Sequence, residues 1–108
     1  MEKENSIKLF GEKTIRSVWD ETEEEWYFSV VDVIGALTDS ANPTDYLKKL
    51  RKRDGLLGEY IGTNCPQVAM ATETGKLRNT LAANTTQLFR IIQSIPSKKA
   101  EPFKLYEV

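Results

Sequence analysis

Helix start and stop signals follow one another closely in the first half of the chain, and they constrain the fold more than any other feature. Ser29 and Asp32 have the spacing of a capping box, with Asp at the position where Glu or Gln is usual. In Asn42-Pro43, a favoured N-cap residue precedes a proline at the first helical position. The signals predict one helix over residues 30–38 and a second over residues 43–53. A short turn joins the two, as in a helix-turn-helix.

Short strands are predicted on both sides of this helix pair. The predicted strands cover residues 7–10, 14–20, 26–28, 67–72 and 77–83. Gly11-Glu12-Lys13 forms a tight turn between the first two, so the first three strands make a β-meander. Glu73-Thr74-Gly75-Lys76 places a glycine in the turn of a β-hairpin that the last two strands form.

The other segments are interpreted as a loop and a third helix. Residues 54–66 contain three glycines and end on a proline, which favours a loop. Asn84 and Gln87 have capping-box spacing and start a helix that Pro96 ends. The apolar residues expected on its inner face are Leu88, Ile91, Ile92 and Ile95.

Together these elements predict a small α+β fold: an N-terminal β-meander, a helix-turn-helix-like helix pair, a β-hairpin and a C-terminal helix. The length of 108 residues fits one domain. We assign residues 1–108 to a single domain with its core at about residues 7–96. Residues 97–108 are then a tail or the start of a linker.

The composition excludes several classes of site. Histidine is absent and cysteine occurs once, at Cys65, so a nitrogen–sulfur metal site is excluded and the commonest general base is missing. Without a glycine-rich phosphate loop or a clustered carboxylate pair, we expect no enzyme activity, no catalytic residues and no metal or other cofactor. A single cysteine, no signal-peptide segment and no apolar run long enough to span a bilayer indicate a cytoplasmic protein that does not bind membranes.

Charge is distributed unevenly along the chain. Residues 1–43 carry four basic and ten acidic residues, a net −6, whereas residues 44–108 carry eleven basic and six acidic residues, a net +5. The densest basic run lies in the second predicted helix and consists of Lys48, Lys49, Arg51, Lys52 and Arg53. A chain with this asymmetry is expected to present one side that attracts anions.

The basic run has two interpretations. On a helical wheel Tyr46, Leu47 and Leu50 face the core, and the basic residues fill most of the remaining arc. A solvated helix face is the ordinary role of a charge run. Such faces usually mix signs because like charges repel, and here only Asp45 has the spacing to pair, with Lys49. The alternative is that phosphates neutralise the face, as on the groove-binding second helix of a helix-turn-helix.

The predicted hairpin offers a second basic contact. Lys76 lies in its turn, and Arg78 follows two residues later on the same side of the strand. The pair either supports the basic helix in holding a nucleic acid or simply keeps an exposed turn soluble.

Three segments of the chain carry a family resemblance. They are WYFSVVDVIGALTDS at 26–40, TNCPQ at 63–67 and LFRIIQSIPSKKAEPFK at 88–104. With the basic helix between the first two, they resemble the Bro-N domain, the N-terminal domain of BRO proteins and of many prophage antirepressors, over about residues 7–105. The resemblance implies a small α+β fold, nucleic-acid binding and a role in phage or mobile-element gene regulation. It brings no catalytic residues.

Two functions therefore remain open. In the first, the chain is the double-stranded DNA-binding domain of a prophage antirepressor-type regulator. Its contact residues would be Lys48, Lys49, Arg51, Lys52, Arg53, Lys76 and Arg78. In the second, the chain binds a repressor protein or a second copy of itself without touching DNA. The acidic residues within 20–25 are then the contact for a repressor or a mimic of DNA charge, and an exposed edge strand at 7–10 is the contact for a homodimer.

Overall fold

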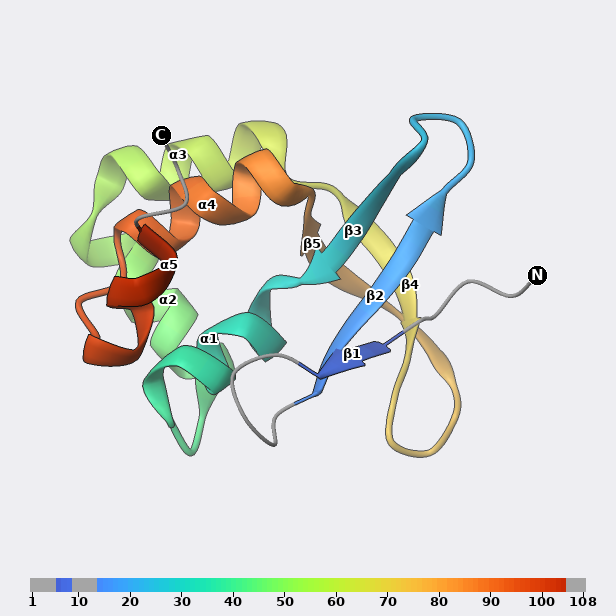
Figure 1. The fold of residues 1–108 in the computed structure, drawn as a ribbon, viewed down its shortest axis with the longest axis horizontal. Coiled ribbons are helices and arrows are strands. Elements are labelled where there is room, and N and C mark those ends of the chain that lie inside the picture. The colour runs from blue at the N-terminus through green and yellow to red at the C-terminus, as the bar shows by residue number, and fades with distance from the viewer. Residues whose placement is uncertain (1–5, 9–13, 105–108) are drawn as a thin grey trace.

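The structure is a computed structural model that describes residues 6–8 and 14–104. Its elements are β1 (Ser6–Lys8), β2 (Thr14–Asp20), β3 (Glu25–Ser29), α1 (Val30–Thr38), α2 (Pro43–Arg53), α3 (Gly55–Asn64), β4 (Gln67–Ala71), β5 (Leu77–Ala83), α4 (Thr85–Gln93), a 3-10 helix η1 (Lys98–Ala100) and α5 (Glu101–Lys104). Helices α2 to α5 gather at one end of the molecule, and the tips of the β2–β3 and β4–β5 hairpins lie at the other (Figure 1). The predicted α+β class is confirmed.

The strands form one antiparallel sheet in the order β1-β2-β3-β5-β4. The predicted meander is confirmed, because β1 pairs with β2 and β2 pairs with β3. The predicted turn at residues 11–13 and the end of the first predicted strand lie outside the described residues. Strands β3 and β5 are joined at Phe28 with Ala83 and at Ser29 with Ala82.

The predicted helix pair is present and begins at the predicted caps. The Ser29 hydroxyl accepts a hydrogen bond from the Asp32 backbone N–H at 3.3 Å, at the start of α1. The Asn42 side chain accepts one from the Asp45 backbone N–H at 3.0 Å, at the start of α2. Helix α1 ends at Asp39, whose φ of +56° lies in the left-handed region. The turn between the helices therefore follows from local sequence signals.

The loop predicted over residues 54–66 is wrong, because most of this segment forms helix α3. Asp54 is the N-cap of α3, and its carboxylate accepts a hydrogen bond from the Leu57 backbone N–H at 3.1 Å. Leu57 and Ile61, one turn apart, are both completely buried. An amphipathic pair and a cap thus specify a helix that the glycines conceal.

One glycine of α3, Gly58, is explained by the neighbouring helix α2. A Cβ atom on Gly58 would lie 2.8 Å from the backbone carbonyl oxygen of Arg51 in α2, closer than real Cβ atoms approach. A Cβ on Gly62 would lie 3.6 Å from Nη2 of the same arginine. Gly58 is therefore required because α2 and α3 approach closely there, whereas Gly62 lies at an ordinary contact distance and Gly55 faces open space.

The predicted hairpin and C-terminal helix are confirmed. Strands β4 and β5 pair in antiparallel register, and Gly75 in the connecting turn has a φ of +88°. Asn84 and Gln87 complete a capping box at the start of α4, with N···O distances of 2.9 and 3.0 Å.

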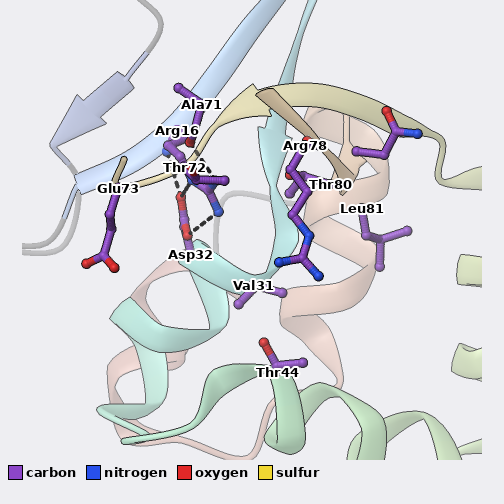
Figure 2. Close-up of a pocket in the computed structure, with 11 residues that line it drawn as sticks. Arg16, Val31, Asp32, Thr44, Ala71, Thr72, Glu73, Arg78, Thr80 and Leu81 are labelled. Atoms are coloured by element: carbon purple, nitrogen blue, oxygen red, sulfur yellow. Dashed lines mark hydrogen bonds and ion pairs between the residues drawn. The ribbon is translucent and has the colours of Figure 1, made fainter. Parts of the chain in front are cut away.

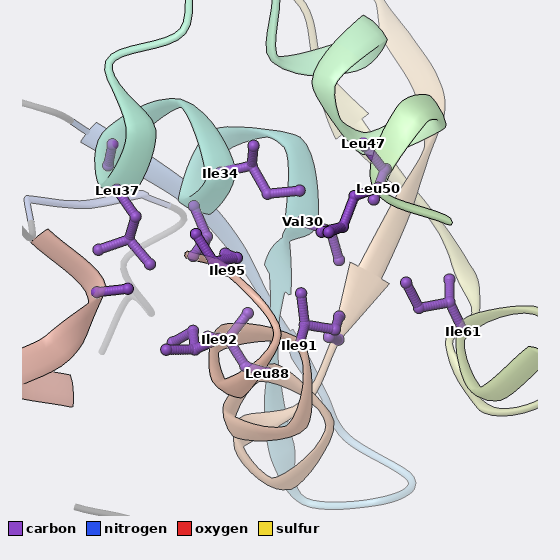
Figure 3. Close-up of a cluster of buried hydrophobic side chains, with 14 of the residues drawn as sticks. Val30, Ile34, Leu37, Leu47, Leu50, Ile61, Leu88, Ile91, Ile92 and Ile95 are labelled. Atoms are coloured by element: carbon purple, nitrogen blue, oxygen red, sulfur yellow. The ribbon is translucent and has the colours of Figure 1, made fainter. Parts of the chain in front are cut away.

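One apolar core lies between the four longer helices and the sheet. Figure 3 shows side chains from these helices and the segment after α4 meeting there: Val30, Ile34, Leu37, Leu47, Leu50, Ile61, Leu88, Ile91, Ile92 and Ile95. Ala100 is buried in the same core, and the Ser97 hydroxyl donates a hydrogen bond of 2.6 Å to the Leu37 carbonyl. The chain beyond Pro96 is thereby held on the core as far as it is described. Among the described residues, no helix has the length and apolar character needed to cross a membrane.

Candidate nucleic-acid interface

Helix α2 presents most of its basic side chains to solvent. Leu47 and Leu50 are buried and hold the helix on the core. Lys48, Lys49, Lys52 and Arg53 are exposed, and Arg51 is partly buried. Within the described part of the chain, one of these five forms an ion pair: the Lys49 ammonium lies 3.1 Å from the Asp45 carboxylate. This is the pair that the sequence spacing predicts, and it leaves the other basic groups of α2 without an acidic partner among the described residues.

Arg51 differs from its neighbours because it lies along α3. Its carbonyl oxygen faces Gly58, and its guanidinium reaches the region of Gly62. Its positive charge also acts on Cys65: burial raises the pKa of that thiol, and Arg51 partly opposes the rise. Packing against α3 therefore limits the positions that this side chain can adopt.

A hollow of about 540 Å³ lies between α2 and the first turns of α3. Its basic lining residues are Lys48, Arg51 and Lys52. The rest of the α2–α3 hollow is lined by Thr44, Leu47, Gly55 and Gly58. Since none of the described residues that line this hollow is acidic, the charged groups around it are positive and favour an anion.

A second hollow, of about 680 Å³, lies between the β4–β5 hairpin and the helices α1 and α2. Figure 2 shows the Arg78 side chain extending from β5 across this hairpin hollow toward Val31 and Thr44. Leu81 and Thr80 line it from the same strand. Thr44 lines both hollows, so the hairpin hollow and the α2–α3 hollow meet at the N-terminal turn of α2.

Arg16 and Asp32 form a charged clamp at the edge of the hairpin hollow. The Arg16 Nε lies 2.8 Å and its Nη2 3.1 Å from the two carboxylate oxygens of Asp32, and its backbone N–H adds a third hydrogen bond of 3.0 Å. Its Nη1 donates to the Ala71 carbonyl at 3.0 Å, at the end of β4. The hydrogen bonds to Asp32 raise the pKa of Arg16. The clamp ties β2, the start of α1 and the hairpin together, and so sets where Arg78 lies.

The structure brings part of the predicted contact set together. Lys48, Arg51 and Lys52 line one hollow, and Arg78 enters the adjoining one. The predicted residues that line neither hollow are Lys49, Arg53 and Lys76, all exposed.

Sequence reasoning did not find several residues that shape this surface: Arg16, Asp32, Thr44, Gly55 and Gly58. Thr44 and Gly55 lie in the first helical turn after the caps Asn42 and Asp54, so their place at the start of a helix can be predicted from the sequence. For Arg16 no such signal exists, because its partner lies in another element.

Comparison with known proteins assigns the chain to a family. No curated protein and no solved structure matches it significantly. Residues 14–108 match the model of Bro-N, the N-terminal domain of the BRO family, which confirms the resemblance seen in the three sequence segments. Since that match covers most of the chain, the protein belongs to the Bro-N family.

Proposed function

We propose that this domain binds double-stranded DNA and acts as the DNA-binding part of a prophage or mobile-element antirepressor-type regulator. Membership of the Bro-N family is consistent with an antirepressor-type N-terminal domain. The observation that carries the proposal is the unneutralised basic surface of α2, where Lys48, Lys52 and Arg53 are exposed and have no ion pair among the described residues.

Binding to phosphates would relieve the charge repulsion on this surface. A helix face with several like charges is destabilised by repulsion of a few tenths of a kcal/mol per pair. DNA phosphates would remove that repulsion and release counterions from the DNA, which favours binding at low salt. Arg78 approaches the same helix from the hairpin, so the basic groups of two elements would hold the duplex from two directions.

The first experiment is fluorescence anisotropy with a labelled random duplex, titrated at several salt concentrations. Wild-type protein is expected to show log affinity falling by about 0.9 per phosphate contact for each unit of log salt. The variant Lys48→Ala/Lys52→Ala should bind more weakly and with a slope smaller by about 2, one for each contact removed.

The matched control is Lys98→Ala/Lys99→Ala. It removes the same charge from exposed positions that line neither hollow, although one of them, Lys99, pairs with Asp39 at 2.6 Å. Equal effects of the two variants would mean that net charge matters and the α2 surface does not.

A protein-interaction module is the competing function. The turn between β2 and β3 exposes Glu21, Glu23 and Glu24, and it points away from α2 (Figure 1). The two hollows, one lined by Lys48 and Lys52 and the other by Arg78, share Thr44, and this favours DNA over the alternative. If wild-type protein binds no duplex even at low salt, the acidic turn becomes the leading candidate surface and the DNA proposal is abandoned.

A further inference from the structure

We infer that one phosphodiester strand of the bound nucleic acid follows a path through both hollows, crossing from one to the other at Thr44. The inference rests on the proposed function and specifies the route of the ligand. It assigns a phosphate-binding role to the glycine-lined floor of the α2–α3 hollow, and it places Arg78 on the same strand path.

The α2–α3 hollow has the properties of a phosphate site. Gly55 leaves space in it, because nothing lies within 4 Å of a Cβ atom placed there, whereas Gly58 lines it with backbone that packs on the Arg51 carbonyl. Lys48 and Lys52 stand one helical turn apart on α2 and line it together with Arg51. Arg51 is already restrained by its packing on α3, so less side-chain entropy is lost when it holds an anion.

The hairpin hollow supplies the second positive end of the path. Two charged residues at its edge, Arg16 and Asp32, are bound to each other at 2.8 Å and so leave Arg78 as the cation available to a ligand. Glu73 also lines this hollow, but it lies on the opposite side of the clamp from Arg78 (Figure 2). A phosphate beside Arg78 would therefore meet an unopposed guanidinium.

The connection at Thr44 selects the class of ligand. Basic groups stand at both ends of the path, and the shared residue between them is a small neutral one with a hydroxyl. A single phosphate ion can satisfy one end only. A chain with regularly repeated negative charges satisfies both, which is the chemistry of a nucleic-acid backbone.

Gly55→Glu tests the path with little effect on folding. Nothing lies within 4 Å of a Cβ atom at Gly55, so the new side chain begins in open space. The position is the first of α3, where the helix dipole favours a carboxylate. The substitution places a negative charge in the α2–α3 hollow, and we expect binding of the labelled duplex to weaken about tenfold or more, as for the loss of a charge-assisted contact.

Thr85→Glu is the matched control for that substitution. Thr85 is exposed, holds the first position of α4 behind its own N-cap, and lines neither hollow. It adds the same charge in the same helical position elsewhere. Gly55→Ala, a neutral variant, should weaken binding less than Gly55→Glu.

The path also requires that a substitution in the hairpin hollow weakens DNA binding. Arg78→Ala should weaken duplex binding and lower the salt slope by about 1. If wild-type protein binds DNA but Gly55→Glu and Arg78→Ala bind no worse than Thr85→Glu, the strand path is wrong and the proposed function stands. If wild-type protein binds no nucleic acid, both fail.

Single-stranded DNA of the same length identifies the source of the strand. If only the duplex is bound, and Gly55→Glu weakens it more than Thr85→Glu does, the path takes one strand of a duplex. If the single strand binds equally well with the same ranking of variants, the path takes an unpaired strand. Orthophosphate is also tested as a competitor, against chloride at the same ionic strength. If orthophosphate displaces all of the DNA from wild-type protein and chloride does not, the hollows are separate anion sites and the strand path is wrong.

Discussion

The Arg16 guanidinium holds three segments of the chain at once. It reaches Asp32 at the start of α1, the Ser29 hydroxyl that caps the same helix and the carbonyl of Ala71 at the end of β4. A guanidinium is suited to this role because its planar donors can serve a carboxylate on one side and a carbonyl on another. The position of the hairpin relative to α1 therefore depends strongly on one side chain.

Arg16→Lys should destabilise the domain even though the charge is kept. Lysine cannot reproduce the two parallel hydrogen bonds to Asp32, nor reach Ala71 at the same time, so we expect the free energy of unfolding to fall by about 1–3 kcal/mol. Urea unfolding followed by circular dichroism measures the change. Lys49→Ala is the comparison, because its exposed pair with Asp45 should contribute no more than about 0.5 kcal/mol. Equal midpoints for the two variants would contradict the clamp.

The Cys65 thiol should react slowly with alkylating agents in the folded protein. Burial raises its pKa, so the folded state keeps the thiol proton to a higher pH than the unfolded chain does. The stability linked to this group is complete below the unfolded pKa and declines as the pH rises above it. Iodoacetamide should therefore alkylate native protein more slowly than urea-unfolded protein at one pH, as followed by mass spectrometry. Equal rates would mean that Cys65 is not shielded.

At the scale of elements, the packing of α3 against α2 determines which of its glycines can be replaced. Gly58 lies against the Arg51 carbonyl, whereas Gly55 faces open space. The two glycines therefore have the same low helix propensity but opposite surroundings. Local composition alone cannot separate them, because the difference lies in a neighbouring helix.

Alanine substitution at these two glycines should have opposite effects on stability. Gly55→Ala is expected to raise the free energy of unfolding by about 0.5–1 kcal/mol, because it reduces the freedom of the unfolded chain without a clash. Gly58→Ala is expected to lower it by about 1–3 kcal/mol, because the new methyl group must push the α2 backbone away. Thermal unfolding of both variants measures the sign. A stabilised Gly58→Ala protein would show that α2 and α3 are not in close contact.

The sequence predicts elements whose signals are local. Caps at Ser29, Asn42 and Asn84 and the hairpin with Gly75 in its turn lie within a few residues of what they control. Helix α3 is not predicted because its glycines conceal the Asp54 cap and the apolar pair Leu57 and Ile61, and the reason for Gly58 lies in the neighbouring helix α2. The basic run on α2 was visible from the sequence, but the hollows were not, since they depend on the spacing between α2, α3 and the hairpin.

At the scale of the whole molecule, the acidic turn between β2 and β3 lies away from the basic helix α2 (Figure 1). Glu21, Glu23 and Glu24 are exposed in the turn between β2 and β3, while the α2–α3 hollow, whose charged lining residues are basic, adjoins α2. The described part of the molecule extends 38 × 30 × 28 Å. The Debye length is about 8 Å at physiological salt, so exposed charges in the turn and on α2 affect each other mainly at low ionic strength.

Neutralising the acidic turn should therefore change DNA binding only when salt is low. In a variant with Glu21, Glu23 and Glu24 all changed to Gln, we expect duplex affinity to rise about two- to threefold at low salt and to match wild type near physiological salt. The same anisotropy titration provides the measurement. If affinity falls instead, the turn takes part in binding directly.

The narrow junction between β3 and β5 also matters for motion. In the described residues these strands are joined at two residue pairs, and the hairpin beyond them is largely exposed from Glu73 to Asn79. Amide protons in the outer hairpin should therefore exchange with solvent quickly, through local opening. Those of the buried helices should exchange slowly, only through global unfolding. The domain would then combine a rigid helical core with a flexible β4–β5 hairpin. Such a hairpin could adjust to a DNA groove whose width varies from one sequence to another.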